Sequence, residues 1–254
     1  MTTTARRIAL GFGSGMLLAA GLAFAADQTI LGRVLTVKAG NNPSQRKVVG
    51  VGVEKNSSNT LVGSPVALGS AGGAILELLA LGATPSAQTF NLPQGVGSNG
   101  KTFWSQTGNL TFKYKDARAE QGPVKGVIIK RTLNGTFSIK AIVSGRSAPL
   151  NIVPPDPGIS GCMALKIGIS PTAGDRYSVQ FGPDGKVKNV GNRIFQVKRP
   201  TLEGICPTGI PTTTTTTIVS TTSTTTSPTT TTTSTTIYGS PSRAFLAPSA
   251  DLLD

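Results

Sequence analysis

Hydrophobic and polar residues alternate with a period of two along most of the chain between residues 27 and 206. In the segment 110–115, Leu110, Phe112 and Tyr114 fall on one face and polar residues on the other. Gly, Pro and Asn stand between such runs, and this combination is typical of strands with one buried face. The pattern predicts strands at Ile30–Lys38, Lys47–Glu54, Leu110–Lys115, Pro123–Arg131, Phe137–Val143, Met163–Ile169, Tyr177–Phe181, Lys186–Val190 and Ile194–Lys198.

Two segments have a more ambiguous pattern. Ala74–Leu81 contains good helix formers, but it is short, bounded by glycines and placed among strands, so we predict a strand over a two-turn helix. Gly50 and Gly52 share one face of a predicted strand. Glycines inside a strand indicate a bulge or a close backbone approach.

Ten or more short strands with frequent turns predict an all-β fold, an antiparallel β-sandwich or barrel-like domain. About 180 residues bury roughly 70% of the surface of the unfolded chain, which is enough for one core. We therefore assign residues 26–206 to a single β-sandwich-like domain. Two subdomains divided near Pro154 are the alternative.

The first residues have the order of a secretory signal. Arg6 and Arg7 precede the apolar run Ile8–Leu22, and Ala23-Phe24-Ala25 forms a small-x-small cleavage site. The run is shorter than the about 20 residues that a membrane span needs. Residues 1–25 are thus predicted to be a signal peptide, with a retained anchor as the alternative. The mature chain is expected to have no transmembrane segment and to be periplasmic, cell-surface or extracellular.

The C-terminal part is of low complexity. From Thr212 to Thr236, 18 of 25 residues are Thr and 4 are Ser, so this stretch cannot bury a core. We expect residues 207–237 to be a disordered linker or glycosylated stalk, the alternative being a repeat expansion without a role. Residues 238–254 are assigned as a tail peptide.

The two cysteines, Cys162 and Cys206, are expected to form a disulfide, because an oxidising compartment favours their pairing. Two free buried thiols are the alternative.

The amino-acid composition limits the catalytic and metal sites that the chain can form. The chain has no His, so His-dependent triads and ordinary zinc sites are excluded. Its acidic residues are scattered, without a calcium-loop pattern. We predict no catalytic residue, no metal site and no cofactor.

Charge is the most unusual property. Residues 27–206 contain 21 Lys or Arg against 9 Asp or Glu. Sequential strands tend to be neighbours, so many of these residues are expected to merge into one patch that binds polyanions. The alternative is that they solubilise the sheet and protect its edges. The predicted patch comprises Lys113, Lys115, Lys125, Lys130, Arg131, Lys140 and Arg146, with a second group at Lys186, Lys188, Arg193, Lys198 and Arg199.

Our leading hypothesis is a secreted, non-enzymatic protein of the cell envelope or extracellular matrix. Its expected partners are acidic polysaccharide, lipopolysaccharide or another extracellular polyanion, and its oligomeric state stays open. One alternative is a polysaccharide lyase that uses Tyr114 or Tyr177 with Lys or Arg. Buried tyrosines would argue against it. Another alternative is a self-assembling surface or fibre subunit.

Several longer motifs also resemble those of a group of secreted β-rich proteins from environmental Gram-negative bacteria. The resemblance spans most of residues 27–206 and implies secretion and a β fold, but no function and no site. It rests on FKYKD (Phe112–Asp116), GPVKGVIIK (Gly122–Lys130), FSIKAIV (Phe137–Val143), VPPDPGISGC (Val153–Cys162), YSVQFGPDGKVKN (Tyr177–Asn189) and PTLEGIC (Pro200–Cys206).

Overall fold

The computed structural model describes residues 26–207 and 213–214. The chain divides into two units, Met1–Val219 and Ser220–Asp254, and every described residue belongs to the first. The predicted signal peptide, nearly all of the Thr-rich segment and the tail peptide lie outside the described residues.

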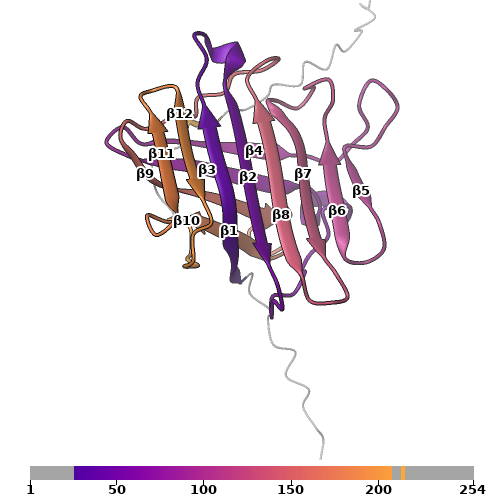
Figure 1. Cartoon of the computed structure of the whole chain (residues 1–254). Helices are drawn as coiled ribbons and strands as arrows, with labels where there is room; N and C mark the ends of the chain where they lie inside the picture. The colour runs from indigo at the N-terminus through magenta and orange to yellow at the C-terminus, as the bar shows by residue number, and fades with distance from the viewer. Residues whose placement is uncertain (1–25, 208–212, 215–254) are drawn as a thin grey trace, which may run out of the picture. The chain divides into compact units, whose positions relative to one another are not determined.

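The described residues form strands joined by turns, with two short 3₁₀ helices, η1 (Pro43–Gln45) and η2 (Gly69–Ala71). The strands are β1 (Asp27–Lys38), β2 (Lys47–Glu54), β3 (Ala74–Gly82), β4 (Ser86–Leu92), β5 (Trp104–Gln106), β6 (Thr111–Lys115), β7 (Val124–Arg131), β8 (Phe137–Ser144), β9 (Gly158–Ile167), β10 (Arg176–Phe181), β11 (Lys186–Val190), β12 (Ile194–Lys198) and β13 (Thr213–Thr214) (Figure 1).

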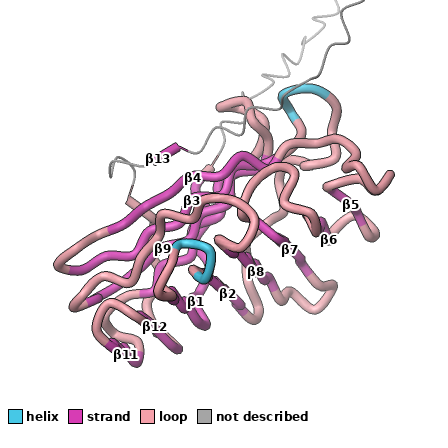
Figure 2. The backbone as a smooth tube through the Cα atoms, turned by 90° about the horizontal axis from the view of Figure 1, so that it is seen from above, coloured by secondary structure: helices cyan, strands magenta, loops and turns pink. Residues whose placement is uncertain are grey.

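The strands lie in two layers that share β1. The front sheet has the order β11–β12–β1–β2–β8–β7–β6–β5, and the rear sheet has the order β13–β4–β3–β9–β10–β1. The rear strands cross behind the front ones (Figure 1), and the view from above separates the two layers (Figure 2). The predicted all-β, sandwich or barrel-like class is therefore confirmed.

β1 passes from one sheet to the other at an irregularity between Gly32 and Val34. Its first residues pair in parallel with β10, and its second half pairs antiparallel with β2 and β12. The β1–β10 and β13–β4 pairs are parallel, so the sheet is mixed, whereas the sequence led us to expect antiparallel pairing throughout.

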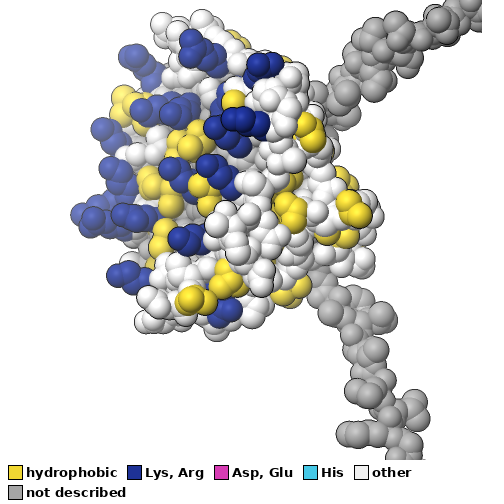
Figure 3. Space-filling model, turned by 90° about the vertical axis from the view of Figure 1, so that its right-hand side faces the viewer, with side chains coloured by type: hydrophobic (Ala, Val, Ile, Leu, Met, Phe, Trp, Pro, Cys, Tyr) yellow, Lys and Arg dark blue, Asp and Glu magenta, His cyan; other side chains and the backbone are white. Residues whose placement is uncertain are grey.

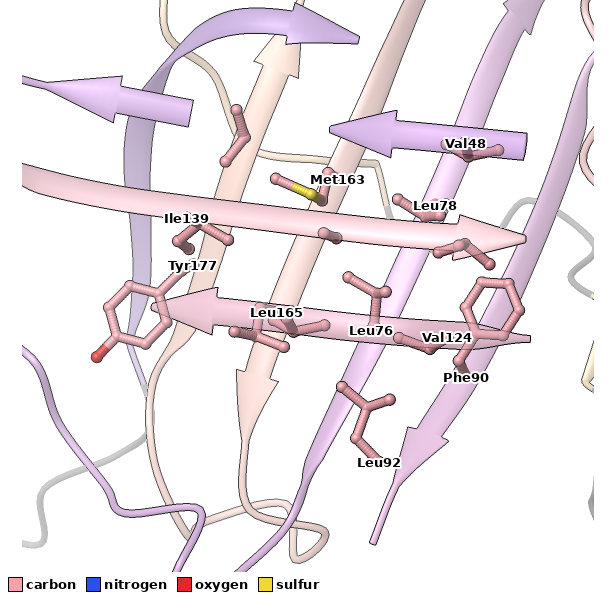
Figure 4. Close-up of a cluster of buried hydrophobic side chains, with 14 of the residues drawn as sticks. Val48, Leu76, Leu78, Phe90, Leu92, Val124, Ile139, Met163, Leu165 and Tyr177 are labelled. Atoms are coloured by element: carbon pink, nitrogen blue, oxygen red, sulfur yellow. The ribbon is translucent and has the colours of Figure 1, made fainter. Parts of the chain in front are cut away.

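The inward side chains of both sheets form one core, part of which is shown in Figure 4. Gly50 and Gly52 lie where the front sheet comes close to side chains of the rear sheet. A Cβ on Gly50 would lie 2.7 Å from Sδ of Met163, and one on Gly52 would lie 2.9 Å from the Cγ atoms of Val179. The close approach expected at these two glycines is confirmed.

Residues 200–207, here called the strap, cross the outer side of the rear sheet. Cys206 forms the expected disulfide with Cys162 of β9, with 5.6 Å between the Cα atoms. Both cysteines pack in a small apolar cluster with Leu79, Ala87 and Ala164, separate from the main core. The strap thus covers apolar side chains that the rear sheet turns away from the interior.

None of the helices among the described residues is long and apolar enough to cross a membrane.

Candidate functional site

The outer side of the front sheet carries a continuous array of lysines, here called the lysine face. The alternation that buries Phe112, Tyr114 and Ile139 turns the intervening residues of the same strands to solvent. The lysine face consists of Lys38, Lys47, Lys113, Lys115, Lys125, Lys130, Lys140, Lys186, Lys188 and Lys198.

The pairing register shows how these lysines lie relative to one another. One row crosses the whole sheet and contains four of them, with half-buried aliphatic residues between. The row runs Lys186, Lys198, Val34, Val51, Lys140, Ile128, Lys113 and Ser105. The neighbouring row runs Lys188, Gln196, Thr36, Val49, Ile142, Gly126 and Lys115.

Acidic residues are missing from this face. In the described strands of the front sheet beyond the β1 crossover, the one carboxylate belongs to Glu54, the last residue of β2. It accepts hydrogen bonds from Ser57 (2.7 Å) and Asn59 (3.1 Å), and burial raises the pKa of its carboxyl. Figure 3 shows Lys and Arg side chains gathered at the left of the view, around hydrophobic patches and without acidic side chains.

Two pairs of lysines are in direct cross-strand register. Lys186 faces Lys198 on β11 and β12, and Lys38 faces Lys47 on β1 and β2. Like charges directly opposite each other destabilise an antiparallel pair by a few tenths of a kcal/mol. Solubility alone does not require this arrangement, because lysines staggered along the strands would serve it equally well.

Two shallow grooves lie among the lysines of this face. The first, of about 210 Å³, has Gly126, Ile128 and Ile142 among its lining residues and is bordered by Lys113, Lys115, Lys125 and Lys140. The second, of about 250 Å³, lies between Lys38 and Lys47, with Thr36, Val49 and Gln196. Each groove thus combines an aliphatic or polar lining with ammonium groups at its sides.

The structure joins the two predicted basic groups through two lysines that the sequence prediction had left out of the patch. Lys38 and Lys47 lie on β1 and β2, between β12 and β8, and they complete the array. Both occupy the polar phase at an end of a predicted strand. Their contribution became recognisable only from the strand order.

Four predicted residues lie off the face. Arg131 follows Lys130 and so points to the opposite side of β7, where it pairs with Phe137 and its Nε is buried. Arg146, Arg193 and Arg199 are exposed in the connections beyond β8, between β11 and β12, and after β12. They extend the positive charge to the rims.

A larger open cavity of about 760 Å³ lies at the rim near the ends of β1 and β12. Its lining includes Arg46, Arg193 and Asp156. Arg46 Nη1 donates to the carbonyl of Leu150 at 2.9 Å. Among the described residues both ion pairs are made by Arg176, so these two arginines add unpaired positive charge beside the lysine face.

The tyrosines considered for a lyase are buried. Tyr114 is 1% exposed, and its ring lies against Phe103 and Trp104. Tyr177 is 0% exposed, and its hydroxyl accepts from the N–H of Val62 at 2.7 Å and donates to the carbonyl of Thr60 at 3.0 Å. Burial raises the pKa of both phenols. Neither ring is placed to take a proton from a polysaccharide.

Within residues 26–207 and 213–214, no group of three or more Cys, Asp or Glu is arranged to hold a metal ion. Searches of protein-family models, curated proteins and solved structures find nothing that matches this chain.

Proposed function

We propose that this protein is exported and binds acidic polymers of the cell envelope or extracellular matrix through its lysine face, without catalysing a reaction. The observation that carries the proposal is the register of the lysines, which brings like charges opposite each other on strands whose outward side, in the described residues, carries no carboxylate. A polyanion relieves that repulsion when it binds.

The residue types on the face favour recognition by charge. Its cations are lysines, which act as hydrated point charges, whereas arginine is the residue suited to bidentate recognition of a carboxylate or phosphate. The aromatic side chains of the neighbouring strands, including Trp104, point inward. The expected ligand is therefore a polymer with repeated negative charges, such as an acidic polysaccharide.

Edge protection accounts for only part of the array. β11 is an edge strand and all of its residues are exposed, so Lys186 and Lys188 serve as guards against strand addition. Lys140 lies on β8, in the interior of the sheet, where there is no edge to protect. The groove that it shares with Lys113 is therefore the best place to test function.

The experiment is a binding titration of the purified mature protein with polygalacturonate at low salt. The double variant Lys113→Gln/Lys140→Gln is expected to weaken binding about tenfold, because two close contacts with the polymer are lost. The matched control is Lys55→Gln/Lys166→Gln, which removes the same charge outside the face and is expected to change binding less than twofold. Equal losses in the two variants would contradict a specific face, and so would the absence of binding by the unaltered protein.

The source of the polyanion is tested in the producing cells. Protein held on the envelope by charge is released by a wash with about 1 M salt, because the Debye length then falls to about 3 Å. If the salt wash also releases the protein from envelopes that were depleted of lipopolysaccharide, the bound polyanion is an acidic polysaccharide. Protein that stays free in the medium, or that resists the salt wash, would contradict electrostatic attachment.

A further inference from the structure

Asp175 places a buried carboxylate beside the start of β1. The residue is 5% exposed. Its Oδ1 accepts a hydrogen bond from the backbone nitrogen of Ala26 at 2.9 Å, and its Oδ2 accepts from the side-chain amide of Gln28. Both donors as described are neutral.

No Lys or Arg of the described chain forms an ion pair with this carboxylate. The neighbouring Arg176 turns away from Asp175 and pairs with Glu77 at 2.6 Å and Asp27 at 3.4 Å. Those are the two ion pairs that the described residues make. A buried carboxylate without a positive partner is unfavourable, so the site lacks a cation.

The sequence provides a way to produce a cation at the backbone nitrogen of Ala26. Ala26 directly follows Ala23-Phe24-Ala25, the expected recognition site of a signal peptidase. Hydrolysis of the Ala25–Ala26 peptide bond adds the hydroxyl of a water to the Ala25 carbonyl carbon and a proton to the Ala26 nitrogen. The new amine takes up a second proton from solvent at neutral pH and becomes an ammonium group.

We propose that processing after Ala25 creates an α-ammonium group on Ala26 that forms an ion pair with Asp175 and fixes the start of β1. The proposal rests on the export part of the proposed function and is independent of the lysine face. The pairing atom is already in place, because the nitrogen that becomes charged is the one 2.9 Å from Oδ1.

Ala26 is also held by its backbone. Its carbonyl accepts a hydrogen bond from the N–H of Arg176 at 2.9 Å. A chain that begins at Ala26 therefore directs its charge to Asp175. A chain with one residue more carries a neutral amide at that atom, and a chain that begins at Asp27 lacks the atom altogether.

The first test is the intact mass of the protein recovered from cells that export it. The expected N-terminus is Ala26. A mature chain that begins at any other residue would overturn the inference while leaving export intact, and an unprocessed chain would contradict both.

The second test compares the purified Ala26 form with a form that carries one additional glycine before Ala26. Urea unfolding should show an unfolding equilibrium constant about tenfold smaller for the Ala26 form. Asp175→Asn should remove this difference, whereas the control Asp27→Asn, which removes a partner of Arg176, should leave it.

Equal stability of the two N-terminal forms would refute the ion pair. That comparison needs no substitution, so it stands even where Asp175→Asn does not fold. Binding of polygalacturonate should be the same for both forms, so a failure here is separate from a failure of the lysine face.

Discussion

Lys186 of β11 and Lys198 of β12 occupy directly opposite positions on the exposed side of an antiparallel pair. Their ammonium groups repel each other in the free protein, whereas both of them attract a bound polyanion. Replacement of Lys198 by Gln is thus expected to stabilise the protein by a few tenths of a kcal/mol and to weaken polygalacturonate binding. Urea unfolding and a binding titration on the same variant measure the two effects.

The gain in stability and the loss of affinity together distinguish polyanion binding from a role in solubility alone. If the lysines only solubilise the sheet, the variant would become more stable without a loss of affinity. Lys55→Gln, in the turn after β2, serves as the control and should leave both quantities unchanged.

The contact between the sheets at Gly161 predicts a large effect of a very small substitution. A Cβ at this position would lie 2.2 Å from Cδ2 of Leu35 and 2.9 Å from the carbonyl oxygen of Leu79. Because the second contact is with backbone, Gly161→Ala should lower the free energy of unfolding by about 1–3 kcal/mol. In Gly50→Ala the nearest atom is the flexible Sδ of Met163, so the loss measured by urea unfolding should be smaller.

The disulfide is expected to contribute strongly to stability. Cys162 and Cys206 are separated by 44 positions in the sequence, and the chain-entropy model gives about 4 kcal/mol for a loop of that size. The variant Cys162→Ser/Cys206→Ser should lose about this much in urea unfolding. An unchanged unfolding midpoint would show that the hydrogen bonds of the strap suffice without the covalent link.

The strap is also expected to loosen in acid through Asp184. The carboxylate of Asp184 accepts hydrogen bonds from the backbone N–H groups of Thr201 and Leu202 and from the Thr201 hydroxyl. The bond from the Thr201 N–H is the main reason that the pKa of this carboxyl lies below its usual value of 3.8. The stabilisation is therefore complete above 3.8 and is lost as the pH falls through the lowered pKa of the folded state.

Hydrogen exchange at the Thr201 and Leu202 amides measures this loss directly. Their protection, corrected for the intrinsic pH dependence of exchange, should decrease on acidification. In Asp184→Ala it should be low at every pH. The amide of Tyr177, in the ladder of β10, is the internal reference and should keep its protection in both cases.

Local patterns in the sequence were sufficient to predict much of the fold. β2, β11 and β12 have the predicted bounds, and the segment that contains Ala74–Leu81 is a strand. β4 was missed because Gln88 interrupts its apolar face: this residue is fully buried, and its Oε1 accepts from the N–H of Asn151 at 2.8 Å. β5 has three residues, too few for a periodic pattern.

Features that depend on contacts between distant residues could not be predicted from the periodicity of the sequence. The passage of β1 between two sheets and its parallel pairing with β10 depend on contacts between residues about 150 positions apart. The strand order also decided which lysines share a face, and so Lys38 and Lys47 were missed. Similarly, the pairing of Ala26 with Asp175 follows from tertiary structure alone.

The disulfide and the strap lie on one side of the domain only. The strap runs over the rear sheet, and β13 pairs with the edge strand β4 of that sheet. The strap therefore lies on the side of the domain opposite the lysine face. A polymer bound to the lysine face is expected to leave the strap and its disulfide untouched.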